Sequence, residues 1–433
     1  MPDSSIAVPL EDWIDPAALF ATWIAHLPHA FWLDAGPDAA AGWSWLGIGE
    51  PDAERTVLAT ELARPGAPTA DAGPFRGGWV GWCGYEPGAQ AAGAPIDADE
   101  LAPPSVWLRT ERLIAFDHAT RRAWAVSRGD ERWADQVRER ARVLPRNREL
   151  PEPAVREAVG RHEPDEYAVL IERCRDAIRD GDAYQLCLTT RFSVDGEVEP
   201  ASVYLRLRNL TPSHHGGYIR SEEIALLSAS PERFLEVGDG MVRTRPIKGT
   251  RPRGADAVAD ARLADELVTS EKERAENVMI VDLMRNDLSR VCAPGSVGVT
   301  DLLVVESYPA VHQLVSMVTG RLVDGTTVGG LLDAAFPAGS MTGAPKLSAM
   351  TILHRLEGGP RGIFAGAFGW VGHDGALDLA MVIRSIVVHH GGAYVGAGGG
   401  ITWRSDAAAE VAEVGIKARG PLAALGAALP PGW

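Results

Sequence analysis

Beyond residue 165, β-rich segments alternate with helical segments, and this pattern limits the folds that the chain can adopt. β-rich runs such as residues 223–237 and 379–402 are separated by longer stretches with helical patterning at 260–291 and 406–420. Short turns join neighbouring β-rich runs, which is typical of antiparallel pairing because parallel strands need a long crossover connection. The pattern therefore predicts an α+β fold in which helices cover antiparallel sheets.

The uneven distribution of tryptophan indicates two regions with different packing. Ten of the 13 tryptophans lie between Trp13 and Trp133. A stretch rich in proline and charge begins at Val143 and is typical of a connector or a surface arm. We therefore predict an N-terminal Trp-rich region at residues 1–150 that packs on a core formed by residues 151–433.

Charge and cysteine content limit the partners and the compartment. The chain has 433 residues, and its 58 acidic against 42 basic side chains give a net charge of −16, so neither nucleic acid nor an anionic membrane is an expected partner. The four cysteines lack the close spacings of a zinc site or a disulfide framework. The N-terminal segment does not have the pattern of a secretory signal, and no apolar run reaches the roughly 18 residues of a membrane span. We expect a cytoplasmic protein.

Two glutamate pairs are the first candidates for chemistry. Glu273 and Glu276 are three residues apart, as are Glu410 and Glu413, and Lys417 follows four residues later. On two facing helices these pairs would gather four carboxylates around a hard cation. Oxygen ligands without histidine or cysteine at matching spacing favour Mg²⁺ over zinc. Solvated helix faces are the commoner explanation of such pairs, and spacing alone leaves that alternative open.

Lys248 and Glu232 are candidates for nucleophilic and acid catalysis. Lys248 lies between an apolar stretch and a Gly-Thr turn, in a segment with several arginines. A nucleophilic lysine must be neutral, and at a reference pKa of about 10.4 only about one in 10³ is neutral at pH 7 without help from its surroundings. An anion-binding or structural role for Lys248 is the alternative. Glu232, in a β-like segment beside Pro231, becomes a candidate general acid if burial raises its pKa.

Three further features carry weaker signals. His312 lies among apolar residues, where a histidine held in the core is commoner than a catalytic one. Arg384 stands among aliphatic residues of a predicted strand and needs an anionic partner, either a ligand carboxylate or an acidic side chain. The glycine run at 396–401 frees backbone amides to approach a carboxylate.

Together, and in this order, the motifs resemble the chorismate-utilising enzymes, the family that includes the anthranilate synthases and the aminodeoxychorismate synthases. The resemblance is strong over residues 165 to about 420 and weaker in the N-terminal region, through FWLDAG and FRGGWVGWCGYE. It implies two large antiparallel β-sheets packed together and flanked by helices. The motifs are SASPERF, RPIKGTRPRG, ERAENVMIVDLMRNDL, YPAVHQLVS, FPAGSMTGAPK, the IRS strand, and GAGGGI followed by E-x-x-E-x-x-x-K.

The resemblance also implies roles for individual residues. Glu276 and Glu413 would coordinate Mg²⁺ on the ring carboxylate of chorismate, and Glu273 and Glu410 would hold the surrounding waters. Glu232 would protonate the departing ring 4-hydroxyl. The remaining residues would contact the substrate: Arg384, Lys417 and the amides of Gly398 and Gly400 at its carboxylates, His312 and Thr342 along the ring, and Thr250 beside the reacting face.

Lys248 separates branches of this family. Anthranilate synthases have a small residue there, which leaves room for ammonia at ring carbon 2, whereas aminodeoxychorismate synthases carry a lysine that occupies carbon 2 while ammonia enters at carbon 4. Gln185 stands where isochorismate and salicylate synthases have a water-activating lysine, which argues against water as the nucleophile. The resemblance thus implies amination of chorismate at carbon 4, with ammonia from a separate glutamine amidotransferase subunit.

Two other functions stay open. An anthranilate synthase component I is disfavoured only by Lys248, and a non-catalytic chorismate-binding regulatory subunit would be expected to have lost Glu232 or a metal carboxylate. Relatives also hold a regulatory amino acid in the N-terminal region. A similar pocket at residues 1–150 is an alternative to simple packing of the tryptophans.

Overall fold

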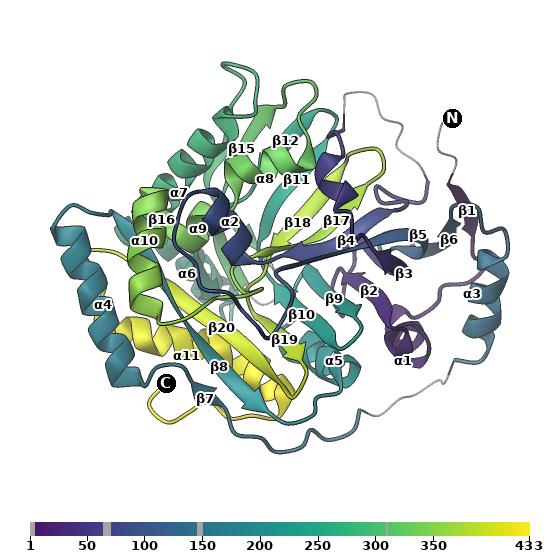
Figure 1. Ribbon diagram of the computed structural model, residues 1–433, viewed down its shortest axis with the longest axis horizontal. Helices are drawn as coiled ribbons and strands as arrows, with labels where there is room; N and C mark the ends of the chain where they lie inside the picture. The colour runs from purple at the N-terminus through teal and green to yellow at the C-terminus, as the bar shows by residue number, and fades with distance from the viewer. Residues whose placement is uncertain (1–4, 64–70, 145–149, 309–310) are drawn as a thin grey trace.

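All twenty strands in the described part of the chain are linked by hydrogen bonds into one antiparallel array, in a computed structural model that describes residues 5–63, 71–144, 150–308 and 311–433 (Figure 1). The array has two halves that meet at β5 (Ser105–Asp117), because β5 pairs with β3 in the first half and with β4 in the second. In order along the sheet, the first half contains β7 (Val159–Gly160), β8 (Gln185–Asp195), β20 (Gly392–Ile401), β19 (Ser385–His389), β10 (Ile224–Ser230), β9 (His215–Ser221), β2 (His29–Asp34) and β3 (Trp43–Pro51).

The second half continues from β5 in the opposite direction. It contains β4 (Gly78–Cys83), β17 (Ala367–Gly372), β18 (Leu377–Met381), β11 (Arg233–Gly238), β12 (Met241–Thr244), β15 (Val311–Arg321) and β14 (Gly298–Ser307). Four shorter additions complete the array: β6 (Arg122–Ser127) beside β5, β1 (Ile6–Pro9) beside β6, β13 (Ile247–Pro252) beside β15, and β16 (Gly343–Ala344) beside β8.

The two halves pack face to face, and helices cover the outer face of the first half. Alternation along β2 shows this, because Phe31 and Leu33 enter a core shared with strands of the second half, while Trp32 enters a core shared with the helices. The prediction of an α+β fold with packed antiparallel sheets and flanking helices is confirmed, and β5 joins the two sheets into one hydrogen-bonded array.

The helices fall into two groups, and α10 (Lys346–Glu357) contributes to the cores of both (Figure 1). Those whose buried residues join the core of the outer face are α1 (Pro16–Thr22), α3 (Trp133–Arg142), α4 (Pro164–Arg179), α5 (Pro200–Leu210) and α11 (Ala407–Leu425), with the short 3₁₀ helix at Ile24–His26. The others are α2 (Tyr85–Ala91), α6 (Ala257–Thr269), α7 (Glu271–Ser289), α8 (Val328–Ala335) and α9 (Gly339–Thr342), with a short 3₁₀ helix at Thr56–Ala59.

The expectation of one helical segment over 260–291 is wrong at a single residue. Ser270 has extended backbone angles, ends α6 and starts α7. Its hydroxyl accepts a hydrogen bond from the amide of Glu273, so the serine serves as the N-terminal cap of the second helix. The break at Ser270, three residues before Glu273, ends one helix and starts a second one.

Strand pairs connect the regions on either side of residue 150. β2 pairs with β9 and β4 pairs with β17, so strands before residue 100 lie inside sheets built from later strands. The predicted connector that begins at Val143 includes residues 145–149, which lie outside the described residues. No helix in the described ranges is both long and apolar enough to cross a membrane.

Candidate active site

The four predicted metal ligands lie near the N-terminal ends of two helices, α7 and α11. Glu273 and Glu276 lie in the first two turns of α7, and Glu410 and Glu413 lie in the first two turns of α11. Asp406 caps α11 by accepting a hydrogen bond from the amide of Ala409 (2.9 Å), which fixes the start of that helix.

The charges of all four carboxylates act on one lysine, Lys272, for which the sequence predicted no role. The Nζ atom of Lys272 lies 3.5 Å from Glu410 Oε1 and 4.0 Å from Glu276 Oε1. Burial acts to lower the pKa of Lys272, but the charges of all four glutamates outweigh it and raise that pKa above its usual value. A local signal for this residue existed, since Lys272 and Glu276 have the i,i+4 spacing of a helical ion pair.

Glu276 has a buried carboxylate oxygen, Oε1, without a hydrogen-bond partner in the described part of the chain. Burial raises the pKa of Glu276, and only partial compensation comes from Lys248 and Lys272. Carboxylate oxygens are the donors that Mg²⁺ prefers, so the donor set fits this ion. As they stand, however, no three acidic, histidine or cysteine side chains of the described residues are close enough to hold one, and the metal assignment stays a prediction.

Lys248 lies in an irregular part of β13. The register with β15 shifts between Ile247 and Thr250, and Gly249 within that bulge has a φ of 81°, a conformation that favours glycine. A methyl group on Gly249 would lie 3.0 Å from Glu273 Oε2, so the bulge presses the backbone against α7. The bulge therefore sets the direction of Lys248, which is half-buried.

Glu232 is close enough to Lys248 for their charges to interact. Burial raises the pKa of Glu232 to about 7, although Lys248, the amide of Ile247 and Lys417 all act to lower it. The backbone of Glu232 is fixed by its carbonyl, which accepts a hydrogen bond from the amide of Met381 (3.0 Å). A carboxyl group that is half protonated near neutral pH can donate a proton to a leaving group and take one back.

The glycine run in β20 has one open backbone edge. β19 pairs with β20 only as far as Val395, so the residues from Gly396 onward are paired on one side, with β8. Lys417 donates to the carbonyl of Gly398 (2.7 Å) and forms an ion pair with Glu413 (2.8 Å). Gly400 lies against Gln185, whose side chain is 1% exposed and whose two amide atoms have no hydrogen-bond partner among the described residues.

Arg384 has a strained backbone. Its φ of 53° places a residue with a large side chain in the left-handed region. Burial lowers the pKa of its guanidinium, and the charge of Glu413 opposes that shift. Within the described ranges the side chain of Arg384 forms no hydrogen bond and no ion pair. An arginine held in this way near the carboxylates is suited to bind an anionic ligand.

The three remaining predicted residues differ in how accessible they are. His312 is buried, with Nδ1 2.8 Å from the Ser307 hydroxyl and Nε2 2.9 Å from Asp260 Oδ1, so both ring nitrogens are already occupied. Thr342 is fully buried and donates to the carbonyl of Ala338 (3.2 Å). Thr250 is exposed. The contacts of His312 are those of a histidine held in the core.

A buried ion pair contacts the backbone of the strand beside the glycine run, and no sequence motif predicted it. Arg361 and Glu357 are both buried and lie 2.7 Å apart. Arg361 also donates to the carbonyls of Met341 in α9 and Cys187 in β8, while Glu357 accepts from the amide of Thr189. The pair therefore satisfies backbone groups of β8 opposite the glycine run.

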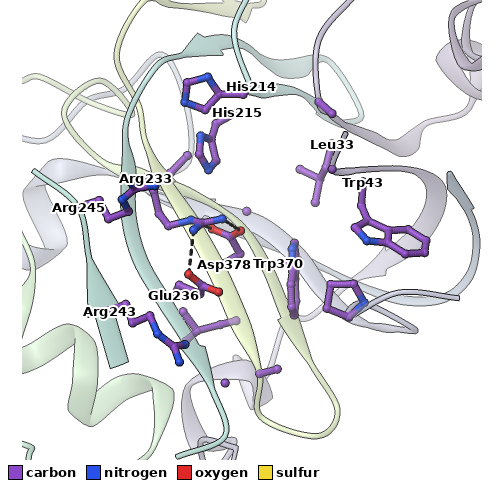
Figure 2. Close-up of a pocket in the computed structure, with 18 of the residues that line it drawn as sticks. Leu33, Trp43, His214, His215, Arg233, Glu236, Arg243, Arg245, Trp370 and Asp378 are labelled. Atoms are coloured by element: carbon purple, nitrogen blue, oxygen red, sulfur yellow. Dashed lines mark hydrogen bonds and ion pairs between the residues drawn. The ribbon is translucent and has the colours of Figure 1, made fainter. Parts of the chain in front are cut away.

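A second feature is a cavity of about 780 Å³ that is separate from the carboxylates. It lies where residues before 150 meet later strands, and Figure 2 shows Trp43 and Trp370 on one side with His214 and His215 above. Arg233 lies on the opposite wall and is held by Asp378 (2.9 Å) and Glu236 (2.8 Å).

The cavity wall carries charges of both signs. Arg243 and Arg245 line it with Arg233, and Arg245 pairs with Glu306. Burial, followed by the charge of Arg233, lowers the pKa of His215 well below its usual value. His215 is therefore neutral at physiological pH, and its Nδ1 atom has no partner among the described residues. A polar ligand of small size fits these surroundings.

Comparisons with known proteins agree with the geometry. The family model described as chorismate binding enzyme matches residues 45–423. The aminodeoxychorismate synthase of Streptomyces pristinaespiralis is 40% identical over 95% of this chain, and the chain spans 64% of that protein, just under two thirds of its length. The anthranilate synthase component 1 of Streptomyces coelicolor is 37% identical over 96% of this chain and 87% of its own. The crystal structure of anthranilate synthase component I from Streptococcus pneumoniae has a TM-score of 0.76 at 28% identity and covers 97% of this chain and 92% of its own.

Proposed function

This chain belongs to the chorismate binding enzyme family, and from that premise we propose that it is an aminodeoxychorismate synthase component I, an amino-group transferase that makes 4-amino-4-deoxychorismate from chorismate and ammonia. The single observation that carries the proposal is that Lys248 lies near enough to Glu232 for its charge to act on that carboxyl group, whose pKa burial raises to about 7. The product would serve p-aminobenzoate and folate synthesis, and the ammonia would come from a separate glutamine amidotransferase subunit.

The reaction begins with Lys248. Its neutral amine attacks ring carbon 2, both conjugated double bonds of the ring shift one position toward carbon 4, and the bond from carbon 4 to its hydroxyl breaks. Glu232 gives its proton to that hydroxyl, which leaves as water. Burial of Glu232 keeps this proton available near neutral pH, because the charged carboxylate is poorly solvated there.

Ammonia completes the exchange. It attacks carbon 4, both ring double bonds return to their first positions, and the bond between carbon 2 and Lys248 breaks to release the neutral amine. The new ammonium group passes one proton to Glu232, which restores the acid. The balance is chorismate and ammonia to aminodeoxychorismate and water, with no oxidation or reduction.

Several side chains would hold the substrate and a metal ion during these steps. Glu276 and Glu413 would bind Mg²⁺, with Glu273 and Glu410 around its waters. When bound, Mg²⁺ withdraws electron density through the ring carboxylate. Arg384, Lys417 and the open edge of the glycine run would orient the carboxylates of chorismate, and the occupied ring nitrogens of His312 suit a residue that shapes the wall.

The test uses the purified chain with chorismate, Mg²⁺ and ammonium, and identifies the product by mass. An aminated product that retains the enolpyruvyl arm supports the proposal, whereas anthranilate with released pyruvate contradicts it. Intact-mass measurement without ammonia should find an adduct on the wild-type chain that is missing from Lys248→Met. If no adduct forms under trapping conditions, the covalent route is wrong.

The same residues argue against two alternative functions. Anthranilate synthase component I is the main alternative, since a relative of that name is 37% identical, and Lys248 argues against it. A non-catalytic regulatory subunit is disfavoured because Glu232 and all four carboxylates of α7 and α11 are present.

We propose further that the cavity of Figure 2 is a regulatory site for an amino acid. Support comes from its aromatic wall, its half-buried neutral His215 and its position between the regions on either side of residue 150. Calorimetric titration of the chain with each of the common amino acids tests this, with Arg233→Met as the control. Absence of heat from every amino acid would contradict the proposal.

A further inference from the structure

Lys272 contacts two of the proposed magnesium ligands at once. Its Nζ atom lies 3.5 Å from Glu410 Oε1, which also accepts a hydrogen bond from the Ser405 hydroxyl (2.7 Å), and 4.0 Å from Glu276 Oε1. Glu276 is on α7 and Glu410 is on α11. The ammonium group therefore links the two helices that would have to hold a metal ion between them.

The other two carboxylates have cations of their own. Arg251 lies 3.6 Å from Glu273, and Lys417 lies 2.8 Å from Glu413. Each of the four carboxylates thus has a basic neighbour, and among the described residues Lys272 is the one that forms ion pairs with two of these four on different helices. Since four negative groups this close repel one another, the basic side chains stabilise the arrangement of α7 and α11.

A divalent cation would need the oxygen atoms that Lys272 now faces. Glu276 Oε1 is buried with no hydrogen-bond partner in the described part of the chain, so it is the oxygen most available to an ion. An ammonium group within 4.0 Å of that oxygen would repel the ion. The side chain of Lys272 is 48% exposed, which leaves it room to move into solvent.

We propose that Lys272 is a built-in competitor of the divalent cation, which bridges Glu276 and Glu410 in the metal-free chain and swings into solvent when the ion binds. The inference rests on the magnesium site of the proposed function. It makes Lys272 a residue that sets the affinity of the site, so the ion binds less tightly than four carboxylates alone would hold it. Loss of the ion leaves α7 and α11 linked.

The experiment measures binding of Mg²⁺ alone to the full chain by calorimetry, after removal of divalent ions with a chelator. Lys272→Met should bind Mg²⁺ about three- to tenfold more tightly than the wild type, because two ion pairs of the half-exposed kind no longer compete. Lys272→Gln should behave in the same way and guards against an effect of shape. Lys272→Arg keeps the charge and should stay within about twofold of the wild type.

A matched control tests whether any lost charge on α7 has the same effect. Arg285 lies on the same helix, is half exposed and pairs with Asp282 (3.3 Å), so Arg285→Met should leave Mg²⁺ affinity within about twofold. Thermal unfolding gives a second readout. Without Mg²⁺ the Lys272→Met chain should unfold at a lower temperature than the wild type, and Mg²⁺ should raise its midpoint by more.

The outcomes separate this inference from the function on which it rests. Unchanged or weaker Mg²⁺ binding by Lys272→Met and Lys272→Gln overturns the competitor role. In that case, loss of Mg²⁺ binding in Glu276→Gln would still support the proposed metal site. Absence of Mg²⁺ binding to every chain overturns the site and the inference together. The amination test above is independent of both results.

Discussion

At the scale of single residues, Glu232 has the most consequential surroundings. Its carboxyl group is poorly solvated, and the charges of Lys248 and Lys417 do not compensate fully, so the pKa is raised to about 7. At neutral pH this carboxyl group is protonated in a large fraction of the molecules, whereas an ordinary glutamate is ionised.

The activity should therefore fall on the alkaline side. A general acid works in its protonated form, so kcat/KM should decline as the pH rises through about 7, the pKa of Glu232. Glu232→Gln should lower kcat about 10²- to 10⁴-fold and remove this limb of the profile. A pH profile with free ammonia held constant checks this, and a limb that persists in the variant would assign it to another group.

The stability of the chain should depend on the same titration. The pKa of Glu232 rises on folding from 4.5 to about 7, so the folded chain binds the proton more tightly, and stability falls as the pH rises through this window. Glu232→Gln removes the loss. We expect the free energy of unfolding of the variant, relative to that of the wild type, to be about 1–3 kcal/mol higher at pH 8 than at pH 5, as measured by urea unfolding. An equal difference at both values would contradict the shift.

At the scale of elements, the N-terminus of α11 controls two carboxylates through one cap. Asp406 accepts a hydrogen bond from the amide of Ala409, one turn before Glu413. Asp406→Ala should destabilise the chain by about 1 kcal/mol and weaken Mg²⁺ binding, because the first turn of the helix frays. Asp15→Ala, at the cap of α1, should lose similar stability with no effect on Mg²⁺. Equal effects of both variants on Mg²⁺ binding would show that the cap has no special role.

The ion pair of Arg361 and Glu357 should be sensitive to the loss of either partner. Both side chains are buried, so one left alone would be an uncompensated charge. Arg361→Met should reduce the free energy of unfolding by about 3–5 kcal/mol, whereas the double variant with Glu357→Met should recover part of it. A double-mutant cycle with urea unfolding measures the coupling, and simple additivity would argue against a mutual dependence.

How far the sequence predicts these elements depends on the range of the interaction. The helices that carry Glu273 and Glu410, and the strand that begins at Gln185, follow from local periodicity, and local spacing places each glutamate pair on one face. The contact of Lys272 with Glu410 depends on how α7 meets α11, and the strained backbone of Arg384 depends on packing around it. Local patterns contain neither, since both are fixed by tertiary structure.

At the scale of the whole molecule, the regions on either side of residue 150 share both cores. Phe31 and Trp82 are buried in the same core as Leu379, and Trp32 is buried with Tyr218. Within the described residues, both hydrophobic cores therefore contain side chains from each side of residue 150.

A fragment of residues 151–433 should not fold alone. Without β2 and β4, the strands β9 and β17 would lose hydrogen-bonded partners and expose apolar side chains. We expect the fragment to aggregate or to unfold without a cooperative transition, and co-expression with residues 1–150 should restore a soluble complex. Circular dichroism with thermal unfolding checks this, and a sharp transition for the fragment alone would show that it is an independent domain.

The pairing of β4 with β17 also concerns how the chain is made. About 280 residues separate the two strands, so at roughly 5–20 residues per second the ribosome needs on the order of 15–60 s to deliver the partner of β4. During that interval an apolar strand with Trp79 and Trp82 has an open edge. The nascent chain can therefore aggregate during most of its synthesis. We expect a chaperone to bind its first hundred residues during that time.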